Sequence, residues 1–180
     1  MKTCIMVYGR FNPVHKAHGL MFGTGMMLER QIENSDFKIF MSTSYDKERN
    51  PLPFSFKREM IEDYYPMCSK YIQLSQESTL FGVLESLNEE YDSLIMLCGS
   101  DRYQNYWKIL QKYNGKLYNF QNIQVISCGD YRENCPYSAT NMRDSVRKND
   151  YERFCTYVPF RTEEINRKYF LLLKTFMEID

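Results

Sequence analysis

The only two histidines of the chain, His15 and His18, lie in the segment 9–18, which reads GRFNPVHKAH. Neutral imidazoles donate hydrogen bonds to phosphate oxygens, and protonated imidazoles add positive charge. Gly9 lets backbone approach a ligand, Pro13 stiffens the turn, and the free N–H groups of the helix expected next favour an anion. This chemistry suits a reaction in which charge grows on phosphate oxygens. The alternative is that one histidine caps the helix and the other is exposed.

A second segment with suitable chemistry reads GSDR and follows an apolar run. Gly99 offers backbone amides and Asp101 a carboxylate, which together could face a ribose or a base. The alternative is that Ser100 or Asp101 caps the helix expected to begin near residue 102.

A third segment, 137–143, reads YSATNMR. Ser138 fits the N-cap of a helix whose first amides could bind an anion. The hydroxyl of Thr140 and the guanidinium of Arg143 could then hold β- and γ-phosphates. A simple serine cap with a solvated arginine is the alternative, but the joint presence of this segment and the histidine segment favours a phosphate site.

Short apolar runs alternate with helix-like stretches between these segments. The runs predict strands, and the stretches between them predict helices. Ser78 and Thr162 are expected to begin the third and the last helix. The predicted strands are 4–8, 37–41, 71–74, 93–98 and 123–127, and the predicted helices are about 18–33, 55–65, 79–90, 102–113, 140–149 and 161–178.

This alternation predicts an α/β fold: a Rossmann-like, doubly wound, parallel five-stranded sheet with helices on both faces and a C-terminal helix. In such a sheet, ligands bind beyond the carboxyl ends of the strands, which is where the three segments lie. Polar loops are expected at 43–54 and 129–137. The length of 180 residues suits one domain spanning 1–180, with a C-terminal helical extension at about 151–180.

Charge and cysteine content limit the kinds of partner and ligand that we expect. Lys plus Arg and Asp plus Glu each number 23, so there is no broad field for a polyanion and we do not expect nucleic acid as a partner. Zero net charge is compatible with self-association, so a homo-oligomer remains an alternative to a monomer. We find no signal peptide or membrane span and expect a cytoplasmic protein. The six cysteines show no C-x-x-C pair and neither histidine lies at zinc-finger spacing from them, which predicts free thiols, including that of Cys135, and no metal ligands in the protein.

The first and third segments together resemble the two signatures of the nucleotidylyltransferase superfamily, G-R-F-x-P-x-H-x-G-H and S-x-T-x-x-R, with the GSDR segment similar to the G-x-D motif between them. The G-R-F-x-P form and the segment 50–58 are most similar to nicotinamide mononucleotide adenylyltransferases. The segments 99–102, 112–116 and 138–143 resemble nucleotidylyltransferase-like phage proteins more closely still. In a phage-encoded protein, the expected location would be the host cytoplasm.

The resemblance implies adenylyl transfer from ATP with Mg²⁺ to a small phosphorylated acceptor, with release of pyrophosphate. Nicotinamide mononucleotide is the expected acceptor. By matching position, the residues implied for catalysis are His15, His18 and Arg143, and those implied for nucleotide binding are Gly9, Arg10, Phe11, Gly99, Asp101, Ser138 and Thr140. The signature glycine between the histidines is Ala17 here, and its methyl group could crowd the nucleotide or be harmless.

Three further side chains are candidates for the acceptor site. Lys57 and Arg58 lie at a predicted helix start, where a nearby anion would offset the opposed helix dipole. Trp107 could stack on an acceptor ring, although aromatic residues at helical spacing more often fill a core. Cytidylyl transfer, phosphopantetheine adenylylation and a non-catalytic binding or structural role on the same fold are the alternatives.

Overall fold

The computed structural model describes residues 1–74, 79–129 and 136–179. The predicted Ser78 cap, the thiol of Cys135 and most of the predicted 129–137 loop lie outside these ranges. The described residues form two compact units. The first contains 1–9, 20–42 and the described residues within 71–134, and the second contains 10–19, 43–70 and the described residues within 135–180.

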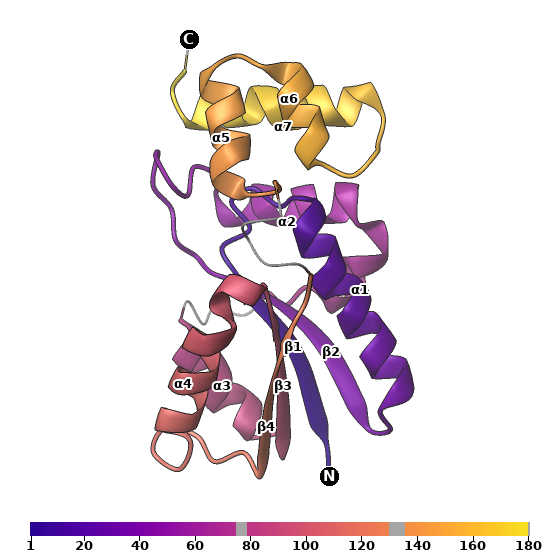
Figure 1. Cartoon of the computed structure of the whole chain (residues 1–180), viewed down its shortest axis with the longest axis vertical. Helices are drawn as coiled ribbons and strands as arrows, with labels where there is room; N and C mark the ends of the chain where they lie inside the picture. Colours follow the sequence, from indigo (N-terminus) through magenta and orange to yellow (C-terminus); the bar gives the residue numbers. More distant parts are fainter. Residues whose placement is uncertain (75–78, 130–135, 180) are drawn as a thin grey trace. The chain divides into compact units, whose positions relative to one another are not determined.

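A parallel sheet of four strands organises the first unit, in the order β2-β1-β3-β4 (Figure 1). The strands are β1 (Thr3–Gly9), β2 (Ser35–Met41), β3 (Ser93–Cys98) and β4 (Asn122–Ser127). Val7 of β1 pairs with Ile39 of β2 on one side and with Leu97 of β3 on the other. The carboxyl ends of these three strands therefore lie together at one edge of the sheet.

The prediction of a fifth strand at 71–74 is wrong. Tyr71 ends a 3₁₀ helix (Pro66–Tyr71), so little extended chain is left in this short run. Ile72 then makes a single isolated bridge with Ile39 of β2. One bridge is not a ladder, and the sheet has four strands.

Helices cover both faces of this sheet. The helix α1 (Lys16–Gln31) packs on one face, where Gly25 lies so close to the ring of Phe37 that a Cβ atom would overlap it. The helices α3 (Leu80–Asn88) and α4 (Tyr103–Tyr113) cover the other face (Figure 1). Thr79 caps α3 by accepting a hydrogen bond from the amide of Gly82 at 3.1 Å.

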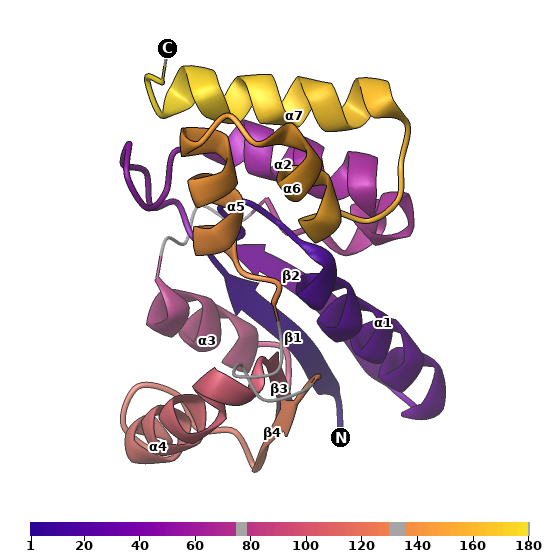
Figure 2. The same cartoon turned by 45° about the horizontal axis from the view of Figure 1, so that its top comes forward.

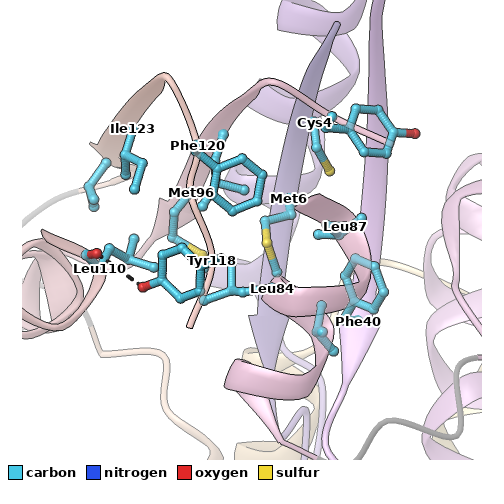
Figure 3. Close-up of a cluster of buried hydrophobic side chains, with 14 of the residues drawn as sticks. Cys4, Met6, Phe40, Leu84, Leu87, Met96, Leu110, Tyr118, Phe120 and Ile123 are labelled. Carbon is cyan, nitrogen blue, oxygen red and sulfur yellow. Dashed lines mark hydrogen bonds between the residues drawn. The ribbon is translucent and has the colours of Figure 1, made fainter. Parts of the chain in front are cut away.

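A cluster of buried side chains joins α3 and α4 to the sheet. Figure 3 shows Leu84 of α3 and Leu110 of α4 facing Met6 and Met96 of the strands. The hydroxyl of Tyr118 donates to the carbonyl oxygen of Leu110 at 3.0 Å, so this ring is buried with its polar atom satisfied. Each such side chain stabilises the fold by about 1.5–3 kcal/mol.

The second unit contains four helices in its described part, α2 (Phe54–Tyr64), α5 (Ala139–Arg147), α6 (Tyr151–Tyr157) and α7 (Glu163–Phe176) (Figure 2). The last helix was predicted, and Thr162 caps it by accepting from the amide of Ile165. The sequence did not separate α6, which begins where Asp150 accepts from the amide of Arg153 at 3.0 Å. No described helix combines the length and apolar character needed to cross a bilayer.

Polar contacts join α2 to α7 in the second unit. Lys168 of α7 pairs with Glu59 at 2.6 Å and with Asp63 at 2.9 Å, both on α2. The hydroxyl of Tyr169 donates to the same Asp63 carboxylate at 2.6 Å. These polar contacts fix the helices that flank the segments described next.

Candidate active site

The two histidines form one compact turn in the second unit. The backbone amide of His15 donates to Nδ1 of His18 at 3.0 Å, and their ring centroids lie 3.8 Å apart. The ring of Phe11 meets that of His18 edge-on at 4.9 Å. Because Nδ1 of His18 accepts a hydrogen bond, the proton of its neutral ring resides on Nε2. His18 therefore has a defined Nε2–H donor.

Burial also fixes the charge of this ring. Removal from water lowers the pKa of His18 well below its usual 6.5, and nearby His15 lowers it further. His15 itself is 7% exposed. Near pH 7, His18 is thus a neutral hydrogen-bond donor and carries no positive charge.

Tyr65 supports the histidine turn through a hydrogen bond and a ring contact, a role that the sequence did not reveal. Its hydroxyl donates to the carbonyl oxygen of His15 at 3.0 Å. Its ring lies against Gly19, where a Cβ atom would be 2.8 Å from Cε1 of Tyr65. A glycine at position 19 is what allows Tyr65 to reach the histidine turn.

Asn12 connects this turn to α5 and to Leu52, in the loop before α2. Arg143 donates through Nη1 to the carbonyl oxygen of Asn12 at 2.7 Å, and through Nη2 to the hydroxyl of Thr140 at 3.3 Å. The amide side chain of Asn12 donates to the carbonyl oxygen of Leu52 at 3.0 Å and accepts from the Leu52 amide at 2.9 Å. Asn12 is 2% exposed, so these bonds are shielded from water.

The start of α5 presents the predicted serine, threonine and arginine together. Ser138 is the N-cap and accepts from the amide of Asn141 at 3.0 Å, as its position predicted. Thr140 is exposed in the first turn, whereas Arg143 is 8% exposed. One helix start thus combines a capped N-terminus with a hydroxyl and a buried guanidinium.

A pocket of about 370 Å³ opens beside these residues, within the second unit. Four guanidinium groups and a single carboxylate line it together with one threonine hydroxyl. The lining residues are Arg10, Glu48, Arg49, Thr140, Arg143 and Arg147.

The pocket concentrates positive charge in a chain whose net charge is zero. Burial lowers the pKa of Arg143, and the neighbouring cations Arg147 and Arg10 lower it further. Arginine binds phosphate through planar, forked donors, and a bound anion would relieve the repulsion among these groups. Of the four arginines, the sequence pointed to Arg10 and Arg143. Arg147 follows Arg143 by one helical turn, a spacing that could have revealed it, but nothing in the 43–54 loop marked Arg49.

Solved structures share this arrangement of strands and helices. No protein-family profile and no curated sequence relative matches the chain. A Vibrio parahaemolyticus structure named as a candidate nicotinate-nucleotide adenylyltransferase matches with a TM-score of 0.60 and 16% identity, over 96% of this chain and 99% of that one. The chain therefore shares the fold of that protein.

A second match to this fold is the bifunctional nicotinamide mononucleotide adenylyltransferase/ADP-ribose pyrophosphatase of Francisella tularensis, with a TM-score of 0.59 and 13% identity. All of this chain aligns with 51% of that protein, so the chain spans about half its length. At these identities the comparisons establish the fold, and the chemistry is argued from the residues.

In this fold, the predicted residues of the first unit lie at one sheet edge. Gly9 ends β1, and its carbonyl oxygen accepts from the amide of Ser42 at 2.9 Å. Gly99 to Asp101 directly follow β3, the parallel neighbour of β1. Ser100–Arg102 form a 3₁₀ turn between β3 and α4, and Arg102 is the residue that precedes α4.

The three acceptor candidates occupy different environments. Lys57, in α2, is 1% exposed, and burial lowers its pKa from 10.5 to about 8. Arg58 pairs with Glu62 on the same helix at 2.8 Å. Trp107, on α4 of the first unit, is 41% exposed, which argues against a core role. Of the three candidates, Lys57 differs most from an ordinary solvated cation, because its side chain is buried.

Proposed function

We propose that the chain is an adenylyltransferase that moves the AMP group of ATP onto a phosphorylated acceptor, with nicotinamide mononucleotide as its substrate. The observation that carries this proposal is the four-arginine pocket joined through Asn12 to the histidine turn. A row of phosphates is the ligand that such a pocket fits best.

In the proposed reaction, an oxygen of the acceptor phosphate attacks the α-phosphorus of ATP. The bond between the α-phosphorus and the bridging oxygen breaks, and pyrophosphate leaves with that oxygen. Arg49 and Arg143 hold the β- and γ-phosphates, while Nε2–H of His18 donates to an oxygen whose charge grows in the transition state. His15 supports His18 through its backbone amide. Gly9, Phe11, Gly99 and Asp101 remain proposed contacts to the nucleotide.

The residues fit a magnesium ion that arrives with the nucleotide. Glu48 is the single carboxylate lining the pocket, and no described cluster of three or more His, Cys, Asp or Glu side chains could hold a metal. Mg²⁺ commonly takes its ligands from phosphates, waters and one or two carboxylates. The Mg²⁺ ion would neutralise charge on the triphosphate, and Glu48 would be its protein ligand from the pocket.

The test is direct incubation of the protein with Mg-ATP and nicotinamide mononucleotide, with nicotinate mononucleotide in parallel. The expected products are pyrophosphate and the corresponding dinucleotide in equal amounts. CTP and phosphopantetheine serve as competing substrates. Absence of pyrophosphate with every acceptor, from protein that binds tripolyphosphate, would refute the enzymatic proposal and favour the binding role.

A further inference from the structure

A tight turn at Asp46–Asn50 carries two of the pocket residues. The backbones of Asp46 and Asn50 exchange hydrogen bonds of 3.0 and 3.2 Å. The Asp46 carboxylate accepts from the amide of Arg49 at 2.7 Å and from that of Glu48 at 3.1 Å. These bonds hold the pKa of Asp46 below its usual value. The turn therefore has its own internal structure, which sets the position of Arg49.

Arg147 attaches this turn to α5. Its Nη2 donates to the carbonyl oxygen of Glu48 at 3.0 Å, and its Nη1 pairs with Asp144, on α5 itself, at 2.7 Å. Both terminal nitrogens of Arg147 therefore contact protein groups. Arg143 also uses both terminal nitrogens on protein groups, so what distinguishes Arg147 is that one of its contacts is to the backbone of the turn that carries Arg49.

Arg49 is exposed, and its neighbour Lys47 makes an exposed ion pair with Glu178 at 2.6 Å. Exposed ion pairs contribute little. The bond from Arg147 to the Glu48 carbonyl ties the middle of the turn to α5, and ordering the turn again on binding would cost affinity if this bond were lost.

We propose that Arg147 is a positioning residue that fastens the Asp46–Asn50 turn to α5 and so holds Arg49 ready for the triphosphate. The identity of the ligand rests on the function proposed above. Arg147 acts through Arg49, whereas Arg143 and Arg49 contact the phosphates.

Limited trypsin cleavage tests the fastening without any need for turnover. Lys47 and Arg49 place two cleavage sites in the exposed turn. Arg147→Met is expected to raise the initial cleavage rate there about tenfold, because cleavage follows the population of the open segment and one charge-assisted hydrogen bond is lost. Arg167→Met is the matched control, since Arg167 makes an exposed pair with Glu163 on α7. An unchanged cleavage rate in Arg147→Met would overturn the proposal.

Calorimetric titration with inorganic tripolyphosphate tests the route through Arg49. Arg147→Met and Arg49→Met are each expected to weaken binding about tenfold, and the double variant no further, because both changes remove the same contact. Losses that multiply in the double variant would show that Arg147 grips phosphate itself and would overturn the positioning role. Turnover of wild-type protein, measured separately, tests the enzymatic proposal, so the two can fail independently.

Discussion

Replacing Arg143 with methionine separates binding from stability. The guanidinium is 8% exposed, and its bond to the Asn12 carbonyl contributes about 1.5–3 kcal/mol, as for other hydrogen bonds to charged groups. Burial of this cation beside Arg147 and Arg10 lowers its pKa and offsets the gain. We therefore expect the free energy of unfolding to change by no more than about 1 kcal/mol.

Binding should respond far more strongly to Arg143→Met. Loss of one forked contact to phosphate is expected to cost about 2–3 kcal/mol, or roughly 30- to 150-fold in the dissociation constant. The assay is calorimetric titration with tripolyphosphate, alongside urea denaturation of the same preparation.

Arg161→Met is the matched control for this prediction. Arg161 also donates to two carbonyl oxygens, those of Asp63 at 3.1 Å and Tyr64 at 2.7 Å, but it does not line the pocket. This variant should lose about 1–2 kcal/mol of stability and keep its affinity for tripolyphosphate. If Arg143→Met instead lost 3 kcal/mol or more and bound tripolyphosphate like wild type, Arg143 would be a structural residue and the reasoning would be refuted.

Four further predictions concern His18, Lys57 and Gly19. His18→Ala should lower turnover by about 10²–10³, and an unchanged rate would remove this donor from the mechanism. The folded protein keeps His18 neutral below pH 6.5, whereas the unfolded chain binds a proton there. The free energy of unfolding should therefore fall as the pH decreases below about 6.5, by up to ~1.4 kcal/mol per pH unit, and should not depend on this group above that pH. His18→Gln should abolish this slope in denaturation curves. Lys57→Met should raise KM for the acceptor, because it removes the buried ammonium group proposed to bind the acceptor; an unaltered KM would contradict this expectation. Gly19→Ala should displace Tyr65 and lower kcat, whereas Gly23→Ala, where a Cβ atom meets nothing within 4 Å, should not; equal rates in the two variants would count against the role of Tyr65.

The sequence predicted the elements whose pattern is local. The strands at 4–8 and 93–98 are nearly continuous apolar runs, which identify buried parallel strands, whereas the strand at 123–127 largely alternates between apolar and polar residues. The run at 71–74 has the same composition, but it begins inside a 3₁₀ turn and cannot add a strand. Composition alone does not distinguish these cases, because the outcome depends on the backbone just before the run.

The candidate site likewise has residues that the sequence predicted and residues that it did not. The histidine and serine segments are recognisable because their residues lie within a few positions of one another. Asn12, Tyr65 and Arg49 escaped notice because their partners are remote in the chain: Leu52 lies 40 residues from Asn12, and His15 lies 50 residues from Tyr65. No local pattern encodes such pairs.

The hydrogen bond between Arg143 and the Asn12 carbonyl spans 131 residues of sequence. A growing polypeptide therefore exposes its histidines to the cell long before the arginine that completes their surroundings has been synthesised. Ribosome-bound intermediates would be unable to bind nucleotide at this site until α5 emerges. If nucleotide binds as proposed, it would stabilise only chains in which α5 has been synthesised, and it would not aid the earlier steps of folding.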